Sequence, residues 1–152
     1  FYFGSGSSMG LASEIFSKKK FVINEQDHRE LCYSRSLNNF IILKKLYCSK
    51  TKKILKISEL FEKKIFSFRD IVKELKDKVI YSEDNTEVEI FDGLVEFYEF
   101  NFKNKKSDFP LNKNYLEMRS EYINKFYFNT DQAQYKNFTC RIPESYLSKY
   151  LF

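Results

Sequence analysis

Ser67-Phe68-Arg69-Asp70-Ile71-Val72 is the stretch that predicts most about the fold of this 152-residue chain. It has the S-x-x-D form of a capping box, in which the first and last side chains each accept a hydrogen bond from the other residue's backbone N–H. Phe68, Ile71, Val72 and Leu75 follow at i, i+3, i+4 and i+7, and so share one helical face. The stretch therefore predicts an amphipathic helix over 68–78.

Two more helices are expected upstream of this one. A broad apolar stripe after Ser36 predicts a helix over 37–48, and it consists of Leu37, Phe40, Ile41, Leu43 and Tyr47. Ile57, Leu60 and Phe61 predict a second, shorter helix at i, i+3, i+4. Nearer the N-terminus, within 10–36, Leu11, Ile15 and Phe16 have roughly helical spacing, and Phe21-Val22-Ile23 is typical of a strand.

Downstream of residue 78 the apolar period changes from 3.6 to 2. Val79-Ile80-Tyr81 is typical of a strand, and Glu87-Val88-Glu89-Ile90 alternates charged and apolar residues like a half-buried strand. Asp92-Gly93 is a strong two-residue hairpin signal, because a type I′ turn needs positive φ at both positions. We therefore expect an antiparallel hairpin that returns over 94–102.

A polar, basic connector, Lys103 to Pro110, separates this part from the C-terminal region. Beyond it, Tyr115, Met118, Tyr122 and Phe126 predict a helix over 113–127. Residues 135–142 are expected to form a strand, and Pro143 stands where a final helix over 144–151 would begin. Residues 111–152 are either a second small domain or the closing elements of one domain.

The order helix, helix, capped helix, hairpin over 37–102 resembles the winged-helix superfamily. Paired winged helices that mediate protein contacts occur at the C-terminus of the small subunit of telomere-capping complexes, and the size and acidic hairpin of this chain are similar. The resemblance implies an α+β fold, namely a winged-helix-like unit with an antiparallel β-hairpin and a small helical and strand extension. That extension would be either a reduced second winged helix or the closing elements of one domain. The implied setting is a nuclear complex.

The amino-acid composition of the chain limits the classes of function that it can have. The chain has 43% hydrophobic and 31% charged residues, as expected for a globular domain of one or two units. Cys32, Cys48 and Cys140 are widely spaced, and His28 has no nearby cysteine pair, so we expect neither a disulfide nor a metal site. We also expect no membrane span, no cofactor and no small-molecule substrate, and a nuclear or cytoplasmic location.

The N-terminal residues 1–9 contain Gly4-Ser5-Gly6-Ser7-Ser8 and are typical of an expression tag before Met9. They are therefore set aside in predicting the fold. The sequence has no glycine-rich phosphate loop and no nucleophile or metal-ligand motif. The chain is accordingly expected not to be an enzyme.

Charge is segregated along the sequence. Residues 40–79 hold 12 basic and 5 acidic residues, residues 80–102 hold 7 acidic and no basic ones, and residues 103–152 hold 9 basic and 5 acidic ones. A basic region beside an acidic one makes a dipolar surface that steers partners.

Two sets of basic side chains are candidate nucleic-acid contacts. The first is a patch of six lysines in 13 residues: Lys44, Lys45, Lys50, Lys52, Lys53 and Lys56. It could bind phosphates without sequence preference. The second is a helical stripe of Arg69, Lys73 and Lys76. This stripe alternatively pairs with the adjacent acids Asp70, Glu74 and Asp77 as an ordinary solvated helix face.

The acidic region is the candidate protein interface, with Glu87, Glu89 and Glu96 predicted to point to solvent. An acidic wing would repel phosphates, so it suits a module that binds protein. The preferred function is a non-catalytic interaction module that contacts protein subunits of a nucleic-acid-associated complex in chromatin, at telomeres or in transcription. The alternative is direct, sequence-tolerant DNA or RNA binding through the lysine patch.

Overall fold

The computed structural model describes residues 1–5, 13, 15–16, 18–26, 38–65, 70–73, 79–105, 108–127 and 140–152. It has a mixed α+β fold with two three-stranded sheets, as the sequence predicts at this level. Within the described part of the chain, no helix combines the length and apolar character needed to cross a membrane.

The first sheet is parallel and has the order β1-β2-β3. Its strands are β1 (Tyr2–Ser5), β2 (Lys20–Glu25) and β3 (Phe40–Leu43). All four residues of β3 are buried, which is typical of a parallel strand covered on both faces. The helix predicted over 37–48 is therefore wrong, because Phe40-Ile41-Ile42-Leu43 is a short, β-prone run that forms a strand.

Residues 2–5 belong to this sheet, although the sequence prediction set residues 1–9 aside. Tyr2 pairs with Lys20 and Ser5 pairs with Ile23, so β1 extends the sheet by one parallel strand. The ring of Phe3 also stacks on Phe21 at a centroid distance of 5.8 Å. The prediction that these residues lie outside the fold is therefore wrong. Their origin as an expression tag stays a prediction.

The second sheet is antiparallel and has the order β5-β4-β6. Its strands are β4 (Lys45–Cys48), β5 (Lys53–Ile54) and β6 (Ile80–Glu83). Only Lys44 separates β3 from β4, so one run of chain passes from the first sheet into the second. The strand predicted around residues 79–81 is confirmed by β6.

Four helices have bounds within the described residues: α2 (Ile57–Glu62), α4 (Glu87–Phe102), α5 (Pro110–Tyr127) and α6 (Glu144–Tyr150). They confirm the helices predicted near 57–61, over 113–127 and over 144–151. Residues 70–73 are helical, as predicted, while the rest of 68–78 lies outside the described residues. Of the strand predicted over 135–142, residues 140–142 are described, and Arg141 forms a parallel bridge with Phe40.

Helix α4 replaces the predicted hairpin. It begins at a capping box in which the Thr86 side chain accepts from the Glu89 N–H and the Glu89 carboxylate accepts from the Thr86 N–H. Gly93 lies within the helix, where a Cβ would stand 2.8 Å from Ile42 and 2.9 Å from Pro143. This glycine allows close packing and makes no turn. The winged-helix layout is consequently not confirmed, because both its first helix and its hairpin are missing.

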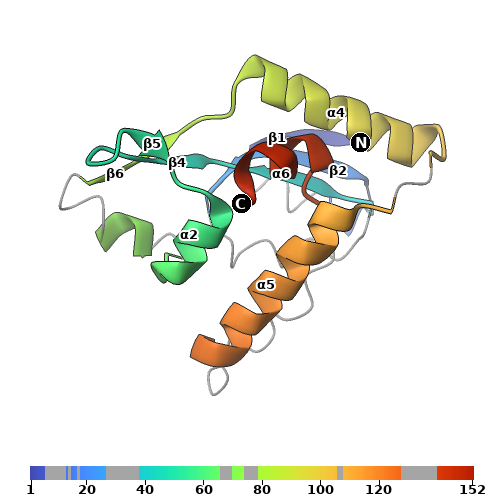
Figure 1. Cartoon of the computed structure of the whole chain (residues 1–152). Coiled ribbons are helices and arrows are strands. Elements are labelled where there is room, and N and C mark those ends of the chain that lie inside the picture. The colour runs from blue at the N-terminus through green and yellow to red at the C-terminus, as the bar shows by residue number, and fades with distance from the viewer. Residues whose placement is uncertain are drawn as a thin grey trace.

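The larger hydrophobic core joins β2, β3, α4, α5 and α6, so the C-terminal helices share one core with the parallel sheet. In Figure 1, α4 lies above the strands and α5 extends below them. A smaller core lies between the antiparallel sheet and α2. These contacts leave the outer face of α4 largely exposed.

Candidate protein-binding face on helix α4

The outer face of α4 is apolar, and its residues are Val88, Phe91, Val95, Tyr98 and Phe102. All five side chains are exposed, including 65% of Phe91 and 63% of Val88. Their spacings of 3, 4, 3 and 4 residues are those of the a and d positions of a heptad repeat. We call these five residues the α4 seam. Contiguous exposed apolar surface of this kind marks interaction sites on folded proteins.

A hollow lies at the middle and C-terminal part of the seam. It has a volume of about 400 Å³ and is lined by Phe1, Leu94, Val95, Phe97, Tyr98, Glu99 and Lys103. Phe1 reaches it because the N-terminus lies close to α4, and its ring stands 5.4 Å from that of Phe97 (Figure 1). The hollow gives a partner side chain a place to insert.

Charged residues border the seam along α4. Asp92 and Glu99 occupy the heptad positions next to the apolar rows, and Glu87 is exposed at the start of the helix. Lys149 lies 3.5 Å from Asp92, and Lys105 lies 2.6 Å from Glu99. Exposed pairs of this kind contribute little to folding, so these carboxylates can exchange partners.

Glu89 is not part of this exposed border, which corrects the sequence prediction. Only 5% of the residue is exposed, and its carboxylate lies 3.1 Å from the buried Lys45 ammonium. The Tyr150 hydroxyl donates a further hydrogen bond to it. Glu89 therefore ties α4 to β4 and α6 and cannot contact a partner, and Lys45 likewise cannot contact nucleic acid.

The pKa of Glu89 reflects this setting. Burial alone would raise the pKa, but hydrogen bonds from Tyr150, the Thr86 N–H and Lys45 outweigh it and hold the pKa below its usual value. Burial and the hydrogen bond to Glu89 raise the pKa of Tyr150, so the phenol stays protonated and remains a donor.

This lowered pKa predicts an acid-sensitive contribution to stability. Because the folded pKa is below the unfolded one, Glu89 stabilises the fold above its unfolded pKa and loses that contribution as the pH falls through the folded pKa. Urea unfolding at pH 7 and pH 3 should show a smaller pH dependence for Glu89→Gln than for the unmodified chain. Equal pH dependence in both proteins would contradict the role assigned to this carboxylate.

Glu96, the third predicted interface residue, also has an internal role. Its carboxylate accepts hydrogen bonds from the Glu144 and Ser145 N–H groups, both at 2.8 Å. These donors are the free backbone groups at the start of α6, which carries no side-chain cap of its own. Glu96 therefore holds α6 against α4. Of the three predicted glutamates, Glu87 alone is exposed, whereas Glu96 is half-buried and Glu89 is buried.

The predicted lysine patch is divided by the fold. Lys44 pairs with Asp84 at 2.6 Å, and Lys56 donates to the Lys149 carbonyl. Lys50, Lys52 and Lys53 are exposed where β4 turns into β5. In the helical stripe, Lys73 is exposed, whereas Arg69 and Lys76 lie outside the described residues.

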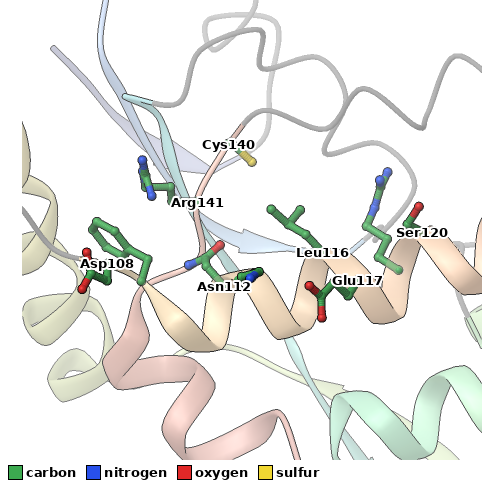
Figure 2. Close-up of a pocket in the computed structure, with 10 residues that line it drawn as sticks. Asp108, Asn112, Leu116, Glu117, Ser120, Cys140 and Arg141 are labelled. Atoms are coloured by element: carbon green, nitrogen blue, oxygen red, sulfur yellow. The ribbon is translucent and has the colours of Figure 1, made fainter.

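A second hollow, of about 450 Å³, lies beside α5. Figure 2 shows Asn112, Leu116 and Ser120 along the helix, with Cys140 and Arg141 across from them. Burial raises the pKa of the Cys140 thiol well above its usual value, which makes it a poor nucleophile at neutral pH. The Arg141 guanidinium is held 4.6 Å from the Phe100 ring and 4.3 Å from the Phe109 ring. The α4 seam is therefore the stronger candidate site.

Sequence reasoning missed the seam, although two signals for it were present. Thr86-Glu87-Val88-Glu89 has the T-x-x-E form of a capping box, and the five seam residues already have heptad spacing. Phe1 in the hollow could not have been found in this way, because its position depends on the packing of β1.

Comparison of the chain with protein-family models, with curated proteins and with solved structures found no match.

Proposed function

We propose that this chain is a protein-interaction module whose α4 seam binds a basic amphipathic helix of a partner subunit. The observation that carries the proposal is the heptad spacing of five exposed apolar side chains on one helix. Apolar a and d residues at this spacing interlock with the matching residues of a second helix.

The dimensions of the seam suit a helical partner. Helix α4 has 16 residues and is therefore about 24 Å long. A partner helix of similar length would place four or five apolar residues along it, and one large side chain would enter the hollow beside Phe97 and Tyr98. Helix-in-groove recognition uses anchors at this spacing.

The charge of the border favours a basic partner. Asp92 and Glu99 lie beside the apolar rows, and lysine or arginine at the flanking positions of the partner would face them. A second copy of α4 fits less well, because an antiparallel arrangement would bring the same acidic row from each copy together. We therefore commit to a different, basic helix as the occupant.

The seam itself can be tested with synthetic helices. A fluorescent peptide of about 20 residues, with leucine at a and d and lysine elsewhere, should bind the chain in an anisotropy titration. The double variant Phe91→Glu, Val95→Glu should weaken this binding by at least about tenfold, because it places charge in the apolar rows. Both side chains are exposed, so the variant should keep the circular dichroism spectrum of the parent.

Two controls make the result specific. Phe152→Glu makes the same change at another exposed apolar residue, outside the seam, and should leave binding unchanged. A peptide with glutamate in place of lysine should bind far more weakly. The proposal fails if both peptides bind equally, if the double variant binds as well as Phe152→Glu, or if the chain sediments as a dimer and binds neither peptide.

A nucleic-acid-associated setting is the second part of the proposal, and direct nucleic-acid binding is the alternative function. The exposed lysines at the β4–β5 turn, Lys50, Lys52 and Lys53, support both, because they could neutralise phosphates. Changing these three residues to glutamate should abolish oligonucleotide binding at low salt without affecting peptide binding. If the parent chain binds no oligonucleotide at low salt, direct binding is excluded.

A further inference from the structure

The antiparallel sheet carries a row of three apolar side chains on the face opposite the smaller core. Side chains alternate between the two faces of a strand, and residues directly opposite each other on neighbouring strands share a face. Cys48 and Ile80 pair with each other and belong to the smaller core. Tyr47 and Tyr81 are the next pair and therefore lie on the other face, where Ile54 of β5 also pairs with Tyr47. We call Ile54, Tyr47 and Tyr81 the tyrosine row.

The two tyrosine rings of the row are accessible to a ligand. Tyr81 lies on the edge strand β6 and is 44% exposed, and Tyr47 beside it is half-buried. The Cβ atoms of directly opposite residues lie about 4.5–5.5 Å apart, so the two rings could each take one of two successive bases. Aromatic rings on a sheet or groove surface are where the bases of a single nucleic-acid strand stack.

Three lysines border the tyrosine row at one end of the sheet. Lys50, Lys52 and Lys53 are exposed where β4 turns into β5, and Lys53 directly precedes Ile54 of the row. The phosphates of a strand whose bases lie on the row would face these ammonium groups. The acidic residue of this face, Glu83, lies at the opposite end of β6, away from the turn.

The backbone at Lys52 is an independent indication that the β4–β5 turn has a function. Its φ is 55°, in the left-handed region that favours glycine and is costly for other residues. The Lys52 side chain is exposed, so burial does not offset this cost. Strained backbone of this kind clusters at binding sites, where the side chain is needed for contact with a ligand.

We propose that the tyrosine row binds single-stranded nucleic acid, with bases stacked on Tyr47 and Tyr81 and phosphates on the lysines of the β4–β5 turn. The inference rests on the alternative function, direct nucleic-acid binding, and does not involve the α4 seam. It adds selectivity for single strands, because the bases of a duplex are already stacked on one another and cannot lie on a ring. An anionic membrane suits this face less well, because peripheral membrane binding buries a broad apolar surface and the row has one aliphatic side chain.

The test is an anisotropy titration of the full chain with fluorescent ten-nucleotide strands of uridine and of thymidine, and with a DNA hairpin of ten base pairs. The single strands should bind at least about tenfold more tightly than the hairpin. Tyr81→Ala should weaken single-strand binding by about tenfold and leave hairpin binding unchanged, whereas Tyr81→Phe should bind as the parent does. The salt dependence of Tyr81→Ala should equal that of the parent, because no phosphate contact is lost. Tighter binding of uridine strands would indicate RNA, and of thymidine strands DNA.

Tyr98→Ala is the matched control, because Tyr98 is 49% exposed, much like Tyr81, but lies in the α4 seam. It should leave single-strand binding unchanged and weaken binding of the leucine–lysine peptide used to test the seam. Tyr81→Ala should do the opposite, which would also show that this variant is folded. Lys52→Gly relieves the strained backbone, so it should unfold at the same or a higher temperature and yet bind single strands more weakly.

The inference is overturned if Tyr81→Ala binds single strands as well as the parent does, or if single strands and hairpin bind equally. In both cases direct nucleic-acid binding through the lysines alone would remain. If the chain binds no oligonucleotide, or binds phosphatidylserine vesicles instead, the inference and the alternative function fail together.

Discussion

Glu89→Lys should destabilise the protein by about 3–5 kcal/mol, which is a large share of the roughly 5–15 kcal/mol that stabilises an ordinary domain. The substitution removes the anion that neutralises buried Lys45 and places a second cation beside it. It also removes the acceptor of the Tyr150 hydroxyl and one half of the capping box of α4. Leaving one partner of a buried ion pair uncompensated is among the most destabilising single changes.

Glu87→Lys is the matched control, because it makes the same charge change two residues away at an exposed position of the same helix. It should change the free energy of unfolding by no more than about 0.5 kcal/mol. Urea denaturation followed by circular dichroism gives both values. If the two variants were equally stable, Glu89 would have to be solvent-exposed, and the attachment of α4 to β4 and α6 would be wrong.

Phe97→Ala should cost about 3–5 kcal/mol by opening a cavity in the larger core. The Phe97 ring is fully buried and stands 5.7 Å from the rings of both Phe21 and Phe40, so it joins α4 to β2 and β3. The surrounding rings belong to different elements and cannot all move in to fill the space. Thermal unfolding should therefore occur at a markedly lower temperature.

Phe91→Ala serves as the comparison, since Phe91 is on the same helix and mostly exposed. It should change stability little and should instead weaken binding of the leucine–lysine peptide. A destabilisation by Phe91→Ala as large as that by Phe97→Ala would mean that the seam is covered by the chain itself. The seam would then be core surface and could not be a docking face.

The elements predicted well are those with a single consistent local signal. Ile57, Leu60 and Phe61 have one helical spacing and lie in α2, and the apolar residues of 113–127 behave likewise in α5. Residues 87–90 carry two signals, because Glu87-Val88-Glu89-Ile90 alternates like a strand while Val88, Phe91 and Val95 are spaced like a helix. The Thr86–Glu89 capping box could have decided between them.

Which residues belong to the candidate sites depended more strongly on tertiary packing than the positions of the helices did. Glu87 and Glu89 are equivalent in the sequence, yet one is exposed and the other is buried against Lys45. Lys44 and Lys45 are adjacent, and only Lys45 is buried. Residue type and spacing cannot separate such neighbours, because the difference arises from which side of α4 or β4 the sheet and α6 cover.

The sequence by itself determined the mixed α+β character, several helix positions and the charge segregation. These are local properties, set by side-chain spacing and backbone preference over a few residues. Only the tertiary structure decided that β1 joins the parallel sheet and that the α4 seam stays exposed to solvent. It also decided that Gly93 is a site of close packing within a helix and not part of a turn. Each of these depends on pairs of residues far apart in the chain, whose meeting is governed by burial of apolar surface and pairing of buried charge.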